Sequence, residues 1–264
     1  MNARHEPSRP ADPTCPLSVV MPVFNEEDSI ADAVDEVRRQ VLDAVPGSEL
    51  WVVDDGSRDH TAEILDRKAA QEVRMHVVHQ PNAGHGAALL RGLSHARGEW
   101  MLLVDSDRQI PLDCFQRIWE KRHGVDALFG HRDDRDDPLM RKLVSAGLKL
   151  QVKLLFGAWL ADPNAPFKLI SRSLWERARM VIPTDCLIPS VFLAVYATRA
   201  GCRCQSVGIA YRKRSAGQTS LRKMTLLKFS ARSARQLVQF RGTPIAAGAA
   251  PNFTTHVATA AKKP

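Results

Sequence analysis

Short apolar segments that alternate with helix-like segments constrain the fold of this chain most. The apolar runs occupy residues 17–24, 49–53, 75–78 and 100–104. Between them apolar residues recur at helical spacing, as at Ile30, Val34 and Val37. Nearly continuous apolar strands that alternate with helices are typical of a parallel sheet with helices on both faces. The sequence therefore predicts an α/β fold.

Polar clusters follow the predicted strands. The clusters are Asn25-Glu26, Asp54-Asp55, Asn82-Ala-Gly84 and Asp105-Ser-Asp107. In open α/β sheets ligands bind beyond the carboxyl ends of the strands. Four clusters at equivalent ends predict a single site.

Asp105 and Asp107 have the spacing of a cation-binding pair. Two carboxylates at a strand end can hold a hard divalent cation, and Gln109 can add an oxygen ligand. Such a cation would neutralise a substrate diphosphate. The alternative for this motif is a solvated turn.

Asp54 and Asp55 can accept hydrogen bonds from a base edge and a ribose, or can cap the following helix.

Length and composition exclude several classes of protein. The 264 residues suit one domain with tails. No apolar stretch approaches the roughly 20 residues of a membrane-spanning helix, and the first 16 residues are polar. We therefore expect a protein that is neither exported nor integral to a membrane by its own signals.

The five cysteines lack metal-ligand spacing and predict reduced thiols of a cytosolic protein.

The charge is divided unevenly along the chain. Residues 186–264 contain 13 Lys and Arg and no Asp or Glu, whereas the first 185 residues contain 24 basic and 29 acidic side chains. The basic segment indicates a phosphate-rich ligand, an anionic membrane surface or nucleic acid. A non-catalytic module that docks on such a surface is therefore one hypothesis. Sparse aromatic residues argue against nucleic acid.

A basic amphipathic helix is predicted over 221–241. Its apolar stripe consists of Leu221, Met224, Leu227, Ala231, Ala234 and Val238, with Arg222, Lys228, Arg232 and Arg235 beside or opposite it. The helix could lie on an anionic membrane surface. It could equally pack on the domain and expose its basic face.

The ordered motifs resemble the family 2 glycosyltransferases of GT-A fold. The matching segments are Pro22-x-x-Asn25-Glu26, Val53-Asp-Asp-Gly-Ser57, Asn82-x-Gly84-x-Gly86-x-Ala88 and Asp105-Ser-Asp107-Arg-Gln109. Pro111, Gly130-His-Arg132, Arg141 and Asp162 before Phe167-Lys168 are most like dolichol-phosphate mannose synthase and other polyprenyl-phosphate glycosyltransferases. The resemblance covers about residues 17–230. It implies a GT-A, Rossmann-like, mostly parallel sheet.

The resemblance also implies roles for individual residues. A nucleotide-diphosphate sugar would be bound by Pro22, Asn25, Glu26, Asp54, Asp55, Asp105 and Arg214. Mg²⁺ or Mn²⁺ would be held by Asp107 and Gln109. Arg132 and Arg141 would grip the phosphate of a polyprenyl acceptor, since a guanidinium matches oxyanions. An inverting, metal-dependent glycosyltransferase follows, located in the cytoplasm or peripherally at the cytoplasmic membrane face.

The identity of the acceptor is less constrained. A lipid phosphate is already ionised and needs no base, whereas transfer to a saccharide hydroxyl would use Asp162 as general base. Asp162 could also only orient the acceptor. The chain departs from the family pattern at Arg108, His131 and Pro166-Phe-Lys168. The motifs do not distinguish between sugars or nucleotide bases.

The expected organisation has four parts. They are a disordered tail over 1–16, a glycosyltransferase domain over 17–220, the basic helix over 221–241 and a disordered tail over 242–264.

Overall fold

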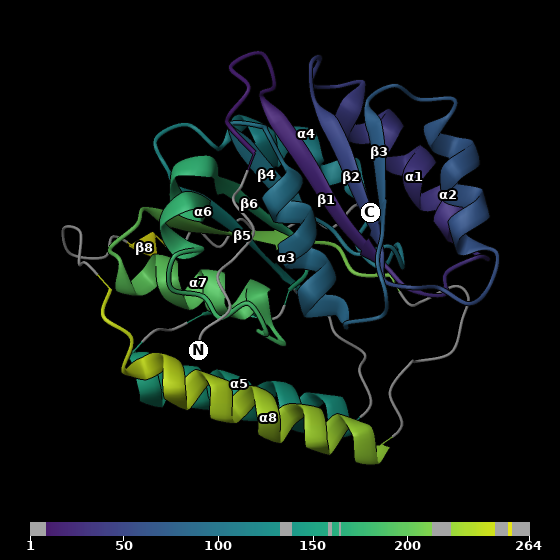
Figure 1. Cartoon of the computed structure of the whole chain (residues 1–264). Helices are drawn as coiled ribbons and strands as arrows, with labels where there is room; N and C mark the ends of the chain where they lie inside the picture. Colours follow the sequence, from purple (N-terminus) through teal and green to yellow (C-terminus); the bar gives the residue numbers. More distant parts are fainter. Residues whose placement is uncertain are drawn as a thin grey trace, which may run out of the picture.

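A computed structural model of the chain describes residues 9–132, 139–157, 160–163, 165–212, 223–245 and 253–254. These residues form a twisted sheet with helices around it (Figure 1). The strands are β1 (Leu17–Val23), β2 (Glu49–Asp54), β3 (Met75–His79), β4 (Trp100–Leu103), β5 (Ala127–Arg132), β6 (Lys168–Ser171), β7 (Cys204–Ile209) and β8 (Phe253–Thr254). The first four begin and end within one residue of the predicted apolar runs.

The strand order in the sheet is β3-β2-β1-β4-β6-β5-β7-β8. β1 pairs in parallel with β2 and β4, and β2 pairs in parallel with β3. β6 runs antiparallel between β4 and β5, while β5 and β7 are parallel. The prediction of a mostly parallel α/β sheet is confirmed.

Helices cover both faces of the sheet. They are α1 (Ile30–Val37) with η1 (Arg38–Leu42), α2 (Thr61–Ala69), α3 (His85–His95), η2 (Leu112–Cys114), α4 (Phe115–Glu120), α5 (Leu139–Phe156), α6 (Arg172–Ala178), α7 (Pro189–Arg199) and α8 (Lys223–Arg241). No helix in this described part combines the length and apolar composition needed to cross a membrane.

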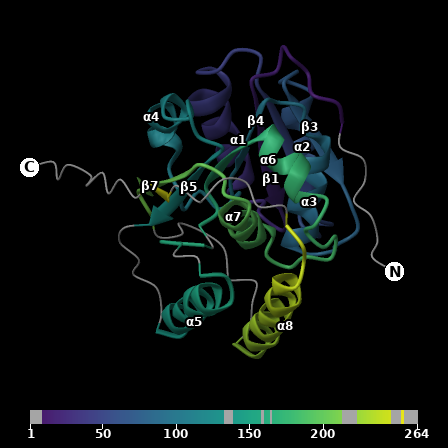
Figure 2. The same cartoon turned by 90° about the vertical axis from the view of Figure 1, so that its left-hand side faces the viewer.

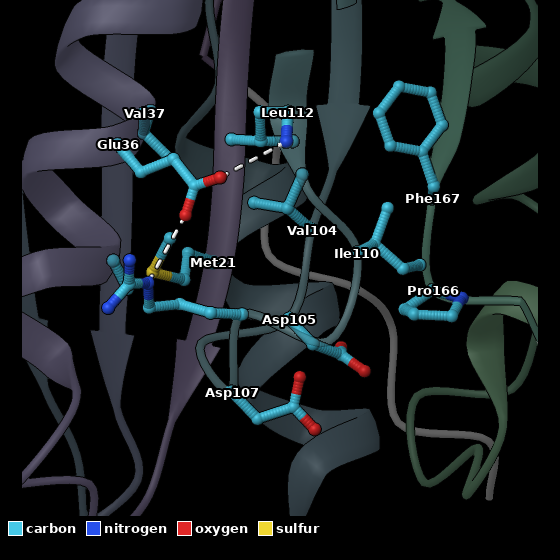
Figure 3. Close-up of a pocket in the computed structure, with 12 residues that line it drawn as sticks. Met21, Glu36, Val37, Val104, Asp105, Asp107, Ile110, Leu112, Pro166 and Phe167 are labelled. Carbon is cyan, nitrogen blue, oxygen red and sulfur yellow. Dashed lines mark hydrogen bonds and ion pairs between the residues drawn. The ribbon is translucent and has the colours of Figure 1, made fainter. Parts of the chain in front are cut away.

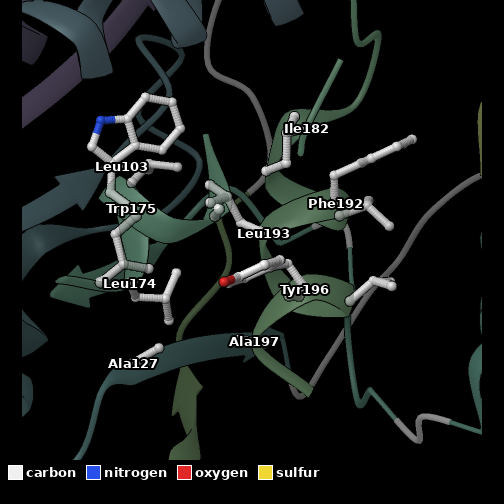
Figure 4. Packing of buried hydrophobic residues seen from close by; sticks show 14 of the residues in the cluster. Leu103, Ala127, Leu174, Trp175, Ile182, Phe192, Leu193, Tyr196 and Ala197 are labelled. Atoms are coloured by element: carbon white, nitrogen blue, oxygen red, sulfur yellow. The ribbon is translucent and has the colours of Figure 1, made fainter. Parts of the chain in front are cut away.

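Successive side chains of the strands point alternately into two hydrophobic cores, one on each face of the sheet. Every residue of β1 and β2 is buried, because both strands are central and covered on both sides. Val20 and Leu103 face the core shared with α3, α6 and α7, whereas Val19 and Leu102 face the core shared with α1 and α4. Figure 4 shows Trp175 of α6 within the first core.

The five cysteines are free thiols, as expected for a reduced protein. Burial raises the pKa of Cys186 to about 12 and that of Cys114 to about 11. Their side chains are therefore protonated at neutral pH, which suits packing rather than chemistry.

Both expected tails contain ordered segments. The backbone amides of Arg9 and Asp12 donate to the carbonyl oxygens of Ser94 and Arg97, each over 3.0 Å. Carbonyls at the end of a helix lack partners within the helix, and here the chain before β1 supplies donors. In the expected C-terminal tail, β8 extends the sheet edge by pairing with β7.

α5 and α8 lie side by side at one end of the molecule, beyond α7 (Figures 1 and 2). The Gln151 amide group donates to the Ala234 carbonyl over 2.9 Å and joins the two helices. On α8, Leu237 and Phe240 are buried in the core, and Phe240 packs on Phe192 with ring centroids 4.8 Å apart. The helix predicted over 221–241 thus packs on the domain.

Of the six residues in the predicted apolar stripe, the structure describes the side chains of three, and two of these do not pack on the domain. Ala231 is exposed and Val238 is 55% exposed, whereas the buried positions are shifted along the helix. The sequence left open whether this stripe faces a membrane surface or the domain, and the buried contacts with the core come from Leu237 and Phe240 instead. Periodicity alone could not separate the inward face from the outward one, because apolar residues occur on both. Ala231 and Val238 instead share the exposed surface with Arg232 and Arg235.

Candidate functional site

Asp54 and Asp55 lie at the carboxyl end of β2 and are 3% and 2% exposed. Asp54 Oδ1 accepts hydrogen bonds from the Ser57 amide over 3.0 Å and hydroxyl over 2.5 Å, while Oδ2 contacts His79 Nδ1 at 2.9 Å. This hydrogen bond raises the pKa of His79, against partial burial and with support from Asp66. Asp54 therefore fixes the turn that follows β2 as well as lying at the predicted nucleotide pocket.

Asp55 holds the loop that follows β3. Its Oδ1 accepts from the Ala83 amide over 2.8 Å and from the Gln80 side chain over 2.7 Å, and its Oδ2 accepts from the Gly84 amide over 2.7 Å. Both oxygens are thus used within the protein. Asp55 shapes the loop beside the predicted pocket, and a direct contact with nucleotide stays a prediction.

The loop after β1 is joined to the loop after β2. Asn25 has a left-handed φ of 52°, and its side-chain oxygen accepts from the Arg58 amide over 2.8 Å. The Glu26 amide donates to the Thr61 hydroxyl over 2.9 Å. Pro22 is buried in β1 opposite Val53. The predicted nucleotide-binding residues of these two loops therefore lie together.

Asp105 and Asp107 follow β4 on one short loop (Figure 3). Asp107 Oδ1 accepts from the Gln109 amide over 3.1 Å. Asp105 Oδ1 lies 3.2 Å from Nε2 of His85, the first residue of α3. Desolvation opposes a charge on His85, but Asp105, Asp55 and Asp107 outweigh it and raise the His85 pKa.

His85 was not among the predicted site residues. His85 stands between the two glycines of Gly84-His-Gly86. The sequence interpretation considered only the glycines of this motif and not the histidine. A Cβ at Gly86 would lie 2.1 Å from the Cys186 carbonyl oxygen, so this glycine is required for close packing. The packing fixes the start of α3, and with it His85, at the site.

A pocket opens beside the Asp105–Asp107 loop (Figure 3). Its walls are mostly apolar and come from β1, α1, the segment after β4 and Pro166-Phe167. Asp105, Asp107, Glu36 and Arg108 supply its polar lining. The pocket therefore joins the predicted donor residues to the segment that contains Asp162.

Arg132 and Asp162 form a buried bidentate ion pair. Arg132 Nε donates to Asp162 Oδ2 over 2.7 Å and Nη2 donates to Oδ1 over 3.1 Å. The two side chains are 8% and 3% exposed. We predicted separate roles, with Arg132 on an acceptor phosphate and Asp162 as base or orienting group. The ion pair joins the two residues in one unit, and both roles stay predictions.

Lys168 interacts electrostatically with both members of this pair. It was not among the predicted site residues, although the sequence departs from the family pattern at this position. It is completely buried at the start of β6 and donates to the carbonyl oxygens of Pro163, over 3.1 Å, and Ala165. Burial lowers the Lys168 pKa to about 7, while Asp162 and Asp105 oppose this and Arg132 adds to it. Through its hydrogen bonds to the Pro163 and Ala165 carbonyls, Lys168 holds the turn that follows Asp162.

Tyr211 and Arg212 connect the two halves of the site. The Arg132 guanidinium lies 5.5 Å from the Tyr211 ring centroid, and the Arg212 amide donates to the Gln109 carbonyl over 2.8 Å. Two consecutive residues thus contact the Arg132 unit and the loop of Asp107. Arg214 and the Arg141 side chain lie outside the described residues.

The donor set around Asp107 fits a hard divalent cation that is completed by substrate. The described ranges contain no group of three or more His, Cys, Asp or Glu side chains that could hold a metal by themselves. Mg²⁺ and similar ions typically use one or two carboxylates together with substrate phosphates and water. Asp107, Asp105 and the Gln109 side chain offer oxygens of this kind on one loop.

Sequence comparison finds relatives among known transferases. "Undecaprenyl-phosphate 4-deoxy-4-formamido-L-arabinose transferase" of Pseudomonas aeruginosa (strain LESB58) is 28% identical over 214 residues, which cover 80% of this chain and 62% of that protein. The protein of the same name from Salmonella choleraesuis is 28% identical over 194 residues, or 72% and 59% of the two chains. The chain therefore spans about three fifths of the length of these relatives.

The fold matches a solved glycosyltransferase structure. Glucosyl-3-phosphoglycerate synthase from Mycobacterium tuberculosis, in complex with uridine diphosphate, aligns with a TM-score of 0.64 at 22% identity and covers 87% of this chain and 81% of its own. A structure of that enzyme with Mn²⁺, uridine diphosphate and phosphoglyceric acid aligns equally well, with a TM-score of 0.64. Residues 18–174, which include the strand-end site through Asp162, match the family described as glycosyl transferase family 2, and the chain belongs to this family.

Proposed function

We propose that the chain transfers a sugar from a nucleotide-diphosphate sugar to a polyprenyl phosphate, with inversion and with the help of Mg²⁺ or Mn²⁺. The observation that carries this proposal is the bridge formed by Tyr211 and Arg212 between the Gln109 carbonyl and the Arg132 guanidinium. It brings a carboxylate loop suited to a diphosphate-bound cation next to a guanidinium suited to a second phosphate. The names of the sequence relatives support the same acceptor class.

In the proposed reaction an acceptor phosphate oxygen attacks the anomeric carbon. The bond from this carbon to the nucleotide diphosphate breaks, and its electron pair leaves with the diphosphate. The oxygen is already ionised near neutral pH, so no proton has to be removed. A bound cation would neutralise the charge of the leaving diphosphate. Arg132 would hold the acceptor phosphate, in an orientation fixed by Asp162.

The pairing of Asp162 also bears on transfer to a saccharide hydroxyl. A general base must reach the proton that it removes. Both Asp162 oxygens accept hydrogen bonds from the Arg132 guanidinium. This arrangement favours an orienting role for Asp162 over a role as base.

The test uses undecaprenyl phosphate, Mn²⁺ and a panel of nucleotide sugars, with Asp107→Asn as the key variant. We expect this variant to lose at least about 100-fold in turnover, because it removes charge stabilisation of the leaving group. Asp113→Asn is the matched control, since Asp113 is an exposed acid on the same segment. The assay measures sugar incorporated into the lipid fraction.

Three outcomes would decide against the proposal or its details. Unchanged turnover in Asp107→Asn would reject the assigned cation site. Transfer to a saccharide hydroxyl and none to lipid phosphate would reject the acceptor class. Complete loss of turnover in Asp162→Asn at saturating acceptor, with an unchanged KM, would support the base and reject the orienting role.

The proposed enzyme would bind an anionic membrane surface through α5 and α8. Neither helix contains Asp or Glu. On α5, Leu150 and Leu154 are 57% and 71% exposed, and Lys149 and Lys153 are exposed beside them. On α8, Arg232 and Arg235 are exposed together with Val238. Exposed apolar and basic side chains in adjacent helices are the composition that binds lipid headgroups and the acyl boundary.

We expect Arg232→Gln/Arg235→Gln to bind phosphatidylglycerol vesicles about 30-fold more weakly, because each basic residue near such a surface contributes about 1 kcal/mol. Vesicle cosedimentation measures this effect. Arg39→Gln/Arg67→Gln removes the same charge from exposed positions on η1 and α2 and should bind like the wild type. Equal losses in the two double variants would show a general charge effect and reject the α5–α8 surface.

A further inference from the structure

Arg108 lies between two predicted cation ligands and is bound to a different element of the fold. Its Nη1 donates to Asp32 Oδ2 over 2.6 Å, and its Nε donates to Glu36 Oε2 over 3.2 Å. Asp32 and Glu36 are one turn apart on α1. A single guanidinium therefore joins the loop of Asp107 to α1.

Glu36 holds the same loop at a second point. Its Oε1 accepts from the Leu112 amide over 3.2 Å (Figure 3). The Glu36 side chain is only 13% exposed, whereas that of Asp32 is 68% exposed. Glu36 is consequently the stronger partner, since an ion pair in a half-buried position is screened less by water and salt. α1 thus fixes both ends of the segment 108–112.

The backbone of Arg108 requires such support. Its φ of 56° is left-handed, a conformation that costs a residue with a side chain roughly 1–2 kcal/mol. The turn at this position directs the carboxylate of Asp107 and the side chain of Gln109, because these residues flank it. An apolar residue at this position could not form either ion pair.

α1 also begins at the loop predicted to bind the nucleotide. Ser29 precedes the helix, and its hydroxyl donates to Glu26 over 2.8 Å. The helix is therefore attached to the nucleotide loop at its N-terminus and to the cation loop through Asp32 and Glu36. One rigid element sets the spacing of the two loops.

We propose that Arg108 is a positioning residue that, through Glu36 and Asp32, presets the Asp105–Gln109 loop for a cation bound to the substrate diphosphate. The proposal rests on the cation site of the proposed function. In this role Arg108 acts through the conformation of the loop and is not itself a ligand of the cation. Its effect is on the affinity for the cation and on the KM of the donor, because a ligand-bearing loop that is not held in place must be ordered on binding.

The test measures Mn²⁺ affinity by electron paramagnetic resonance. The nucleotide present is uridine diphosphate or guanosine diphosphate, whichever raises the thermal stability of the wild type. We expect Arg108→Gly to weaken Mn²⁺ binding about tenfold, the lower end of the range for residues that hold metal ligands in place. Glycine permits the left-handed backbone and removes the whole side chain, and with it the guanidinium. Arg117→Ala removes an exposed arginine of α4 and is expected to bind like the wild type.

A charge exchange separates the ion pair from a general effect of substitution. Arg108→Glu should bind Mn²⁺ more weakly than Arg108→Gly, and Glu36→Arg/Arg108→Glu should recover part of the loss. Hydrogen exchange without ligand provides a second measurement, in which the amides of 107–110 exchange faster in Arg108→Gly. Wild-type affinity in Arg108→Gly, or unchanged exchange of the amides of 107–110 in that variant, would overturn the proposal.

The outcomes also separate this inference from the proposed function. If the wild type binds Mn²⁺ with nucleotide but glycosylates no lipid phosphate, the proposed acceptor is rejected, and a tenfold loss in Arg108→Gly still supports the positioning role. If the wild type binds Mn²⁺ with neither diphosphate, both are rejected.

Discussion

Replacing Arg132 by methionine is expected to lower the free energy of unfolding by about 3–5 kcal/mol, because it leaves the Asp162 carboxylate buried without its partner. Asp162 is 3% exposed at its side chain, so water cannot solvate the remaining charge. Urea denaturation near neutral pH measures the change. Few single substitutions in this domain should be as costly.

A double-mutant cycle tests whether the loss arises from the pair. Arg132→Met/Asp162→Asn removes both charges and should be more stable than Arg132→Met alone. The exposed pair Arg203–Asp126 is the matched control, with 3.7 Å between its charged groups and 61% exposure at the arginine. Arg203→Met should cost less than about 1 kcal/mol. Equal costs for the two arginine variants would show that burial does not determine the effect.

The second large effect is the pH dependence contributed by Lys168. In the folded protein burial lowers the Lys168 pKa from its ordinary value of 10.5 to about 7. Between these pH values the unfolded chain binds a proton that the folded protein does not bind. Stability therefore rises with pH across this window, by about 1.4 kcal/mol per pH unit near its middle.

Lys168→Met removes this contribution. We expect the free energy of unfolding of the wild type, relative to this variant, to rise by about 2.3 kcal/mol between pH 7 and pH 9, since the slope at pH 7 is half of its maximum. The comparison cancels other groups that titrate in both proteins. Lys121→Met, at a partly exposed lysine after α4, should leave the slope unchanged. Parallel curves for wild type and Lys168→Met would contradict a neutral Lys168 in the folded protein.

The first half of the fold was predictable because its information is local. Each of β1 to β4 is a nearly continuous apolar run that polar residues follow, and parallel strands bring those ends together. The second half lacks such signals. β6 is inserted between β4 and β5 and runs in the opposite direction, a pairing that depends on distant segments rather than on local pattern.

The candidate site shows the same division. The spacing of Asp105 and Asp107 predicted their shared loop, because the two residues are almost adjacent in the chain. The pairing of Arg132 with Asp162 joins residues that are 30 positions apart, and no spacing rule predicts it. Asp55 shows a different limit of prediction from sequence. Its carboxylate was predicted to bind the nucleotide, but in the structure it accepts hydrogen bonds from the loop that follows β3. Residue type gives the chemistry of a group but not its partner.

The reversed direction of β6 has a consequence for how this site can diversify. Lys168, the first residue of β6, lies opposite Leu103, the last residue of β4. The segment that leads into β6 therefore ends at the same edge of the sheet as the carboxyl ends of the parallel strands. Insertions or replacements in this segment change the surroundings of Arg132 and leave β1 to β4 intact. Under the proposed function, a change in this one connection would alter the acceptor side and leave the residues proposed to bind the nucleotide unchanged.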